Sequence, residues 1–224
     1  MTLGRPRLHL RETTSTNDRA RELAARGATH GTIVTAGAQT AGRGRQGRTW
    51  TAPAGSSLLV SLVLRAYDGL LPLRAGLTVA DLAGPTARVK WPNDVLIGGR
   101  KVAGILAETR PTEGWAVLGI GLNAALDLND LPTDLRATAA TLGRTRGELD
   151  RVLEELLERL TAWLAAPVDE VLPALRARDA LLDRPVAWNG GDGVGAGIDD
   201  AGRLLIRRGD GSQTVLDAGE VHLR

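Results

Sequence analysis

The chain has 224 residues, 43% hydrophobic and 24% charged, which is ordinary for a soluble globular protein and enough for one large domain plus a small second one. It contains no cysteine, which excludes disulfides, thiolate metal sites and a cysteine nucleophile. The formal net charge of +2 argues against a broad nucleic-acid-binding face. The three histidines, His9, His30 and His222, lie too far apart in sequence to show metal-ligand spacing.

The N-terminal segment has no continuous apolar run after its basic residues, so it does not resemble a signal peptide. No stretch approaches the roughly 20 apolar residues needed to cross a bilayer. We therefore expect a cytoplasmic protein with no membrane partner.

The first half of the chain predicts both helices and strands. Polar residues 13–18 are typical of the start of a helix, which continues to residue 26 and ends at Gly27. Strands are predicted over 31–36, where β-branched residues cluster, and over 57–64, where the apolar run indicates burial on both faces. A helix over 73–83 is followed by short strands near 87–91, 95–97, 101–108 and 115–122, whose hairpin-like connections indicate a mixed sheet.

The second half begins with the clearest helix of the chain, over 148–165. One face of it carries a core-facing leucine stripe: Leu149, Leu153, Leu156, Leu157, Leu160 and Leu164. A helix over 168–181 and five short strands between residues 185 and 223 follow. The chain is thus predicted to be α+β, with a mixed, helix-flanked sheet over 1–181 and a small β-barrel over 182–224.

The segment from Gly42 to Trp50 combines three glycines with Arg43, Arg45 and Arg48, and no Asp or Glu occurs between residues 23 and 67. Guanidinium groups match phosphate oxygens, and glycines let a backbone approach a ligand closely. The segment therefore indicates a mobile cationic loop that closes over an anion, and we expect it to be disordered when the site is empty. The alternative is a solvated surface loop.

Only two of the 28 basic residues are lysines, Lys90 and Lys101. In a chain that favours arginine, a lysine can mark a place where a compact ammonium on a flexible stem is needed. Chance is the alternative explanation for their closeness.

Five motifs occur in order along the chain: Ser15-Thr16-Asn17, residues 39–45 with Gln39 and the first arginines, Lys90-Trp91-Pro92-Asn93-Asp94, Gly99-Arg100-Lys101, and residues 119–123 ending at Asn123. In order and spacing they resemble biotin–protein ligase across nearly the whole chain. The resemblance implies a catalytic domain like that of class II aminoacyl-tRNA synthetases and biotin ligases, followed by a C-terminal SH3-like barrel. Because the motifs begin near residue 13, we expect the monofunctional type without an N-terminal DNA-binding domain.

The resemblance also implies a two-step reaction. Biotin and Mg-ATP give biotinyl-5′-AMP and diphosphate, and a lysine of a biotin carboxyl carrier domain of acetyl-CoA carboxylase or another acyl-CoA carboxylase then takes the biotinyl group. The expected partners are this carrier domain, biotin, ATP and Mg²⁺, with no nucleic acid.

Site residues follow from the resemblance, position by position. Ser15, Thr16 and Gln39 would bind the ureido ring, and Lys101 would contact the biotin carboxylate and the α-phosphate. Asp94 would orient or deprotonate the acceptor lysine. The biotin set is Ser15, Thr16, Asn17, Gln39, Arg43, Gly44, Arg45 and Lys101; the ATP set is Arg43, Arg45, Arg48, Trp50, Asn93, Lys101 and Asn123; the catalytic set is Lys101, Arg45 and Asp94. No side chain is assigned to a metal, because phosphate oxygens supply most ligands of Mg²⁺.

Simpler interpretations stay open for several positions. Ser15 or Thr16 can be only a helix cap, and Asn93-Asp94 can be an ordinary turn. Lys90 can pair with a carboxylate beside the site, and Glu108 is interpreted as structural. For the whole protein, the alternatives are a lipoate–protein ligase or related acyl-carrier ligase, and an Arg/Gly-loop nucleic-acid-binding protein.

Overall fold

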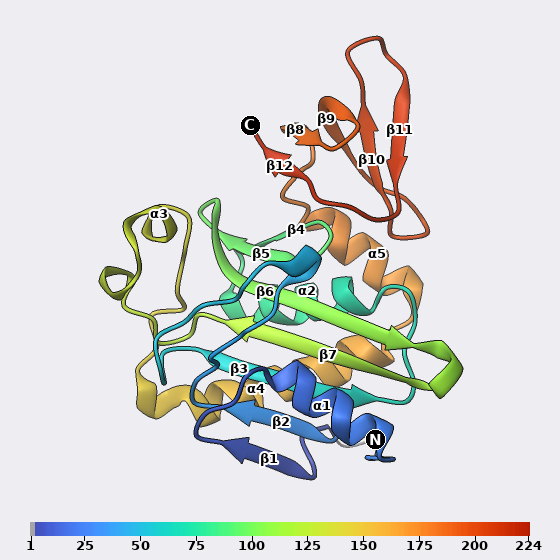
Figure 1. Ribbon diagram of the computed structural model, residues 1–224. Coiled ribbons are helices and arrows are strands. Elements are labelled where there is room, and N and C mark those ends of the chain that lie inside the picture. Colours follow the sequence, from blue (N-terminus) through green and yellow to red (C-terminus); the bar gives the residue numbers. More distant parts are fainter. Residues whose placement is uncertain (1–2) are drawn as a thin grey trace.

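The computed structural model describes residues 3–224 as two β-sheets with helices around the larger one (Figure 1). The larger sheet has seven strands in the order β1-β2-β3-β7-β6-β5-β4. Its strands are β1 (Arg7–Leu10), β2 (Ile33–Ala36), β3 (Leu58–Leu64), β4 (Arg88–Lys90), β5 (Asp94–Ile97), β6 (Arg100–Arg110) and β7 (Trp115–Leu122). Strands β1 and β2 run parallel, whereas the other neighbours are antiparallel, so the sheet is mixed as predicted.

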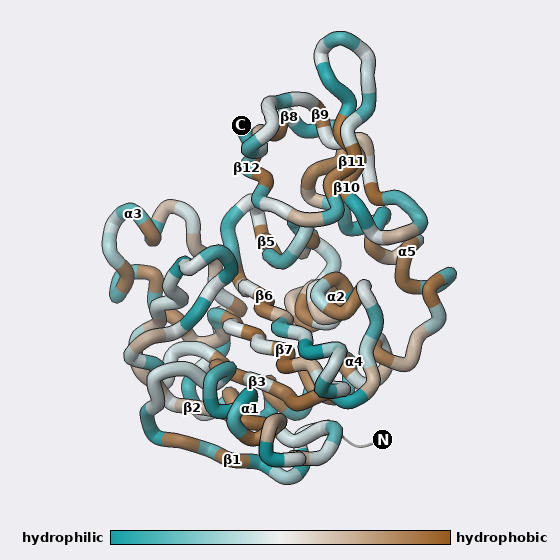
Figure 2. The backbone as a smooth tube through the Cα atoms, turned by 45° about the vertical axis from the view of Figure 1, so that its right-hand side comes forward, coloured by the Kyte–Doolittle hydropathy of each residue, from teal (hydrophilic) through white to brown (hydrophobic). Residues whose placement is uncertain are grey.

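Helices cover both faces of this sheet. Helix α1 (Thr16–Ala25) packs on β2, β3 and β7 on one face, while α2 (Leu71–Ala83) packs on β4 to β7 on the other and is itself covered by α4 (Leu149–Ala165). All seven residues of β3 are buried, because each face of the strand meets a helix layer. Figure 2 shows hydrophobic residues along this strand and in the helices around it.

The predicted leucine stripe on α4 is in the core: Leu153, Leu156 and Leu160 are buried, and Leu149, Leu157 and Leu164 are partly buried against them. Helix α5 (Val168–Ala177) is shorter than predicted. The chain leaves the helix to pair with β4, where the Val89 amide donates to the Arg178 carbonyl and the Ala180 amide to the Val89 carbonyl. That contact is distant in sequence, so the local pattern could not reveal it.

Two further elements belong to the larger part of the molecule. Strand β1 was missed, because its alternation of polar and apolar residues extends over only four residues, and most of this edge strand is exposed. The segment between β7 and α4 forms a small lobe that holds the short helix α3 (Thr133–Arg136). None of the helices within residues 3–224 is long and apolar enough to span a membrane.

The C-terminal part forms a five-stranded antiparallel sheet in the order β11-β10-β9-β8-β12. Its strands are β8 (Pro185–Trp188), β9 (Gly191–Ile198), β10 (Leu204–Arg207), β11 (Gln213–Leu216) and β12 (His222–Leu223). Buried residues such as Ile206 and Val221 join the main core, and the Trp91 indole donates to the Gly202 carbonyl at 3.1 Å. Trp91 is therefore a core residue that ties the two parts together. The predicted α+β class with a small C-terminal β-domain is confirmed.

Candidate active site

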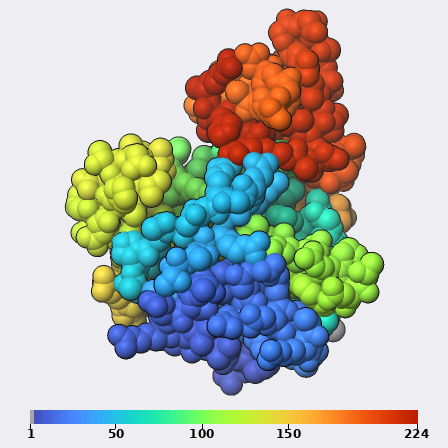
Figure 3. Space-filling view, viewed as in Figure 1, coloured from blue at the N-terminus to red at the C-terminus, as the bar shows by residue number. Residues whose placement is uncertain are grey.

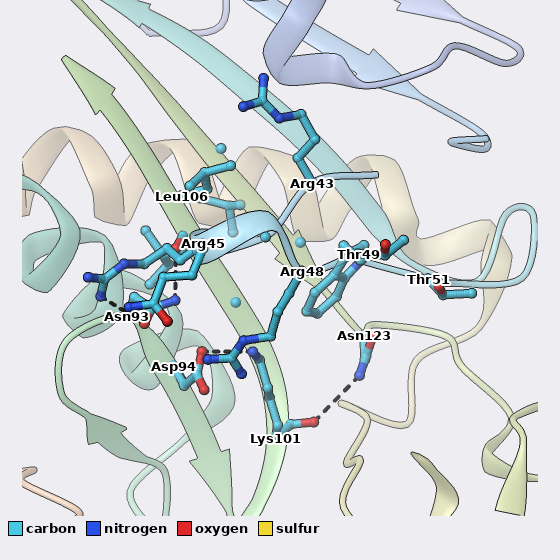
Figure 4. Close-up of a pocket in the computed structure, with 18 of the residues that line it drawn as sticks. Arg43, Arg45, Arg48, Thr49, Thr51, Asn93, Asp94, Lys101, Leu106 and Asn123 are labelled. Carbon is cyan, nitrogen blue, oxygen red and sulfur yellow. Dashed lines mark hydrogen bonds and ion pairs between the residues drawn. The ribbon is translucent and has the colours of Figure 1, made fainter. Parts of the chain in front are cut away.

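A cavity of about 310 Å³ opens on the α1 face of the large sheet, and every site residue predicted from the sequence lines it. Figure 4 shows part of this lining, with Arg43, Arg45 and Arg48 above Asp94, Lys101 and Asn123. The predicted residues that the fold brings together are Ser15, Thr16, Asn17, Gln39, Arg43, Gly44, Arg45, Arg48, Trp50, Asn93, Asp94, Lys101 and Asn123.

One end of the cavity is polar and buried. The Thr16 amide donates to Gln39 Oε1 at 2.7 Å, and Thr16 Oγ1 lies 3.0 Å from the same oxygen. Ser61 Oγ lies 2.8 Å from Thr16 Oγ1 and 2.6 Å from Asn17 Oδ1. Ser15 occupies the N-cap position of α1, but its side chain makes no capping hydrogen bond. Helix capping therefore does not account for the Ser15 hydroxyl, which stays available to the cavity.

A cluster of charged side chains forms the opposite wall. Lys101 Nζ lies 2.7 Å from Asp94 Oδ1, and Lys90 Nζ lies 4.0 Å from Asp94 Oδ2. Burial lowers the pKa of Lys90, although the negative charge of Asp94 opposes this shift. Lys90 thus lies near a carboxylate beside the site, which agrees with the simpler interpretation of this lysine. Asp94 is also the first residue of β5 and not merely part of a turn.

The Arg loop, residues 42–50, connects β2 to β3 and crosses the front of the molecule to the C-terminal domain, as Figure 3 shows for the cyan segment. Arg43 donates to Asp18 at 2.8 Å, and Arg48 forms an ion pair with Glu220. Arg45 donates to Asn93 Oδ1 at 3.2 Å, and burial lowers its pKa. The loop thus lacks acidic neighbours in sequence, but the fold supplies them from α1 and the C-terminal domain. The loop is folded in this structure, and its disorder in an empty site stays a prediction.

Trp50 lies flat on a platform of two glycines in neighbouring strands. A Cβ atom on Gly121 would come within 2.5 Å of the Trp50 ring, and one on Gly104 within 3.0 Å. The ring centroid is 5.6 Å from Lys101 Nζ, and the indole N–H is buried without a hydrogen-bond partner. Only residues without side chains leave room for the indole here. A glycine inside each of two neighbouring strands was the available signal for this platform, because glycine in a strand can mark a close approach of another group.

Two other parts of the cavity wall were also missed. The lobe around α3 contributes apolar residues, including Leu131 and Ala139, next to Asn123, whose amide donates to the Ala140 carbonyl at 3.0 Å. The C-terminal domain contributes Glu220 and its neighbours. Neither segment carries a local pattern that indicates a ligand.

Proteins of known family resemble this chain in both sequence and fold. Residues 10–124 match the family described as biotin/lipoate A/B protein ligase, and residues 185–224 match the biotin protein ligase C-terminal domain. A biotin–[acetyl-CoA-carboxylase] ligase of Mycobacterium tuberculosis is 38% identical over 95% of this chain and 87% of the relative. An enzyme of the same name from Paracoccus denitrificans is 36% identical over 95% and 98%, respectively.

Among solved structures, biotin protein ligase from Aquifex aeolicus in complex with biotin and ATP superposes with a TM-score of 0.81, at 29% identity, and the match covers 99% of both chains. Fold, motifs and C-terminal domain thus agree. The chain belongs to the biotin/lipoate A/B protein ligase family.

Proposed function

We propose that the chain is an ATP-dependent biotin ligase, which joins biotin to AMP and then transfers the biotinyl group to a lysine of a biotin carboxyl carrier domain. The observation that carries this proposal is the cavity itself, in which a buried polar end and a cluster of cations share one space. The names of the Mycobacterium and Paracoccus relatives and the biotin and ATP bound in the Aquifex structure support it.

The first step brings a carboxylate to a triphosphate, so charge repulsion opposes the attack. The carboxylate oxygen of biotin attacks the α-phosphorus, and diphosphate leaves. Lys101, with Arg45 above it, offsets the charge of both reactants and of the developing transition state. Partial burial in the cavity strengthens these interactions, because the effective dielectric constant is lower there than in bulk water.

The second step needs a neutral acceptor amine. The amine of the carrier lysine attacks the acyl carbon, AMP leaves and one proton is lost. At neutral pH an unperturbed lysine is deprotonated only about once in 2,500 molecules. Asp94 is the partly buried carboxylate of the cation cluster, and we assign it the role of orienting the incoming lysine or accepting its proton.

We assign the remaining predicted residues to the two substrates. Ser15, Thr16, Asn17 and Gln39 form the end that receives the ureido ring, and Arg43 with Gly44 closes over it. Nucleotide contacts belong to a second group of side chains: Arg45, Arg48, Trp50, Asn93, Lys101 and Asn123.

Magnesium is expected as the counter-ion of ATP. No cluster of three His, Cys, Asp or Glu side chains suited to a metal exists among residues 3–224. Asp94 Oδ1 is buried and, apart from its ion pair with Lys101, accepts no hydrogen bond of good geometry. This carboxylate therefore fits a cation that phosphate oxygens hold from the other side. The bound ion would neutralise part of the triphosphate charge.

We further propose a division into a catalytic domain over 1–181 and a C-terminal domain over 182–224, in a cytoplasmic protein. The two family matches, which end at residue 124 and begin at residue 185, support this division.

The test is to incubate the protein with Mg-ATP, biotin and a biotin carboxyl carrier domain, and to weigh the carrier by mass spectrometry. The expected result is one biotinyl group per carrier, and none on a carrier whose acceptor lysine is replaced by arginine. Parallel reactions with lipoate and octanoate distinguish the lipoate–protein ligase alternative. Modification by those acids but not by biotin would overturn the proposal.

A further inference from the structure

Behind the polar end of the cavity, a continuous chain of hydrogen-bonding groups leads to a carboxylate. Glu108 Oε2 lies 2.9 Å from Asn17 Nδ2, and Asn17 Oδ1 lies 2.6 Å from Ser61 Oγ. Ser61 Oγ lies 2.8 Å from Thr16 Oγ1, which in turn lies 3.0 Å from Gln39 Oε1. Ser61, Thr16 and Asn17 are at most 4% exposed, so water does not complete this chain.

The charge of Glu108 decides which way the chain points. An ionised carboxylate can only accept hydrogen bonds, so the Asn17 amide must turn Nδ2 toward Glu108, at 2.9 Å, and Oδ1 toward Ser61. The Leu106 carbonyl, 3.4 Å from the same Nδ2, favours the same orientation through a longer contact. The single hydroxyl proton of Ser61 then goes to Asn17 Oδ1, which cannot donate. Ser61 must accept the next hydrogen bond, and the hydroxyl proton of Thr16 is the one available.

The number of hydroxyl protons therefore leaves one oxygen–oxygen contact without a proton. Three oxygen–oxygen contacts, from Asn17 to Gln39, share only two hydroxyl protons. The contact without a proton is the longest, between Thr16 Oγ1 and Gln39 Oε1, because the backbone amide of Thr16 already holds Gln39 Oε1. These two oxygens present lone pairs at the cavity wall and need a donor from the ligand.

We propose that Glu108 is a positioning residue that makes this end of the cavity an acceptor of ring N–H groups and thereby selects a cyclic urea over a plain acyl chain. This inference rests on the proposed biotin ligase function and names what fixes its specificity. A ligand without N–H donors leaves the facing lone pairs of Thr16 Oγ1 and Gln39 Oε1 without a donor, and polar groups left without a partner discriminate strongly between otherwise similar ligands.

The other oxygen of Glu108 serves the Arg loop. Glu108 Oε1 lies 3.4 Å from Arg43 Nη2 and 3.5 Å from Arg21 Nη1. The same carboxylate therefore contacts the Arg loop and sets the direction of the hydrogen bonds behind the polar end of the cavity. Gly119 makes room for the chain, because a Cβ atom there would clash with Asn17 Oδ1. From the sequence alone, Glu108 is interpreted as structural, and Ser61 and Gly119 have no separate role.

A donor–acceptor swap tests the inference. In E108Q the new amide can turn either its oxygen or its NH₂ toward Asn17. Only the longer contact of Asn17 Nδ2 with the Leu106 carbonyl, at 3.4 Å, then opposes a flip of the Asn17 amide, so the direction of the chain is no longer fixed. In N17D two carboxylates face each other. In the double variant E108Q/N17D, the amide introduced at position 108 donates to the carboxylate introduced at position 17. The second oxygen of that carboxylate still accepts from Ser61, which restores the original direction.

The expected result is a rise of about tenfold or more in the KM for biotin in each single variant, with the KM for ATP within about twofold of wild type. The preference for biotin over octanoate in adenylate formation should fall in the same variants, and the double variant should recover most of both values. R21Q is the matched control, because it removes a contact of Glu108 Oε1 and leaves the chain intact. Its KM for biotin should stay within about twofold of wild type.

S61A adds a second measurement that does not depend on the swap. Without Ser61, the Thr16 proton is free to bond Gln39 Oε1, so both oxygens are satisfied in the empty site and the penalty against octanoate shrinks. Wild-type discrimination in E108Q and S61A, or a double variant as impaired as its parents, would overturn the inference while leaving a working biotin ligase. Failure of the wild type to adenylate biotin would overturn the proposed function itself.

Discussion

Lys101 Nζ lies 2.7 Å from Asp94 Oδ1, and the two residues belong to the neighbouring strands β6 and β5. The pairing of these strands is irregular between Val95 and Leu96, where the register shifts. The ion pair fixes a cation on the cavity floor at the place where, in our proposal, carboxylate and phosphate meet.

The first prediction concerns this cation. Lys101→Ala should reduce biotinyl-adenylate formation by about 100-fold or more, because the charge that offsets both anions is lost. Single-turnover assays with quenched-flow analysis of the adenylate provide the measurement. Arg100→Ala removes the exposed basic neighbour on the same strand and should leave the rate nearly unchanged.

The second prediction concerns retention of the intermediate. Arg45 reaches across the cavity and donates a hydrogen bond to Asn93. Arg45→Ala should therefore loosen the closed Arg loop and let biotinyl-adenylate escape into solution. The adenylate in the filtrate of an ultrafiltered reaction, measured by mass spectrometry, should rise while ATP consumption continues. A filtrate as free of adenylate as that of the wild type would show that Arg45 does not close the site.

The third prediction concerns the glycine platform. Gly121→Ala places a methyl group against the Trp50 ring, which must move off the sheet. We expect at least a several-fold rise in the KM for ATP and a smaller quench of the protein's tryptophan fluorescence by nucleotide. Gly69→Ala is the control, since a Cβ atom there would have no atom within 4 Å. Equal behaviour of both variants would contradict the assignment of Trp50 to the nucleotide.

The fourth prediction concerns the contact between the Arg loop and the C-terminal domain. Glu220→Ala removes the ion pair with Arg48, so trypsin should cleave residues 42–50 faster in the absence of ligands. Biotin with ATP should slow this cleavage, as followed by mass spectrometry of the fragments. Glu158→Ala, on the exposed side of α4, should cleave like the wild type. An unchanged rate in Glu220→Ala would mean that the contact does not restrain the loop.

The fifth prediction concerns pH. Burial lowers the pKa of Lys90 in the folded protein below its ordinary value of 10.5, so the unfolded chain binds more protons between the two values. The charged lysine therefore destabilises the fold below the lowered pKa, and this cost disappears as the pH rises toward 10.5. Lys90→Met should raise Tm most at neutral pH, and the gain should shrink in alkaline buffer. A gain that is constant with pH would mean that Lys90 titrates normally.

The sequence predicted those features that local patterns determine. Continuous apolarity identified β3, the leucine stripe identified α4, and the motifs named thirteen residues that all line one cavity. The predictions of β3 and α4 succeeded because strand burial and helix amphipathicity depend on the sequence of only a few neighbouring residues. The domain boundary, the residue roles, the cytoplasmic location and the use of Mg²⁺ stay predictions.

The features that were missed depend on contacts between distant parts of the chain. Asp18 and Glu220 offset the charge of the Arg loop from α1 and from the C-terminal domain, and no pattern near the loop indicates either of them. Helix α5 ends early because β4 pairs with the residues after it. The role inferred for Glu108 follows only from a count of protons in a buried network.

The most direct test of the account is ATP–pyrophosphate exchange in the absence of any carrier domain, with labelled pyrophosphate, Mg²⁺ and the wild-type protein. If the cavity joins the biotin carboxylate to the α-phosphate, label should enter ATP only when biotin is present, and Lys101→Ala should abolish the exchange. Exchange that is independent of biotin, or no exchange at all with a folded protein, would contradict the account.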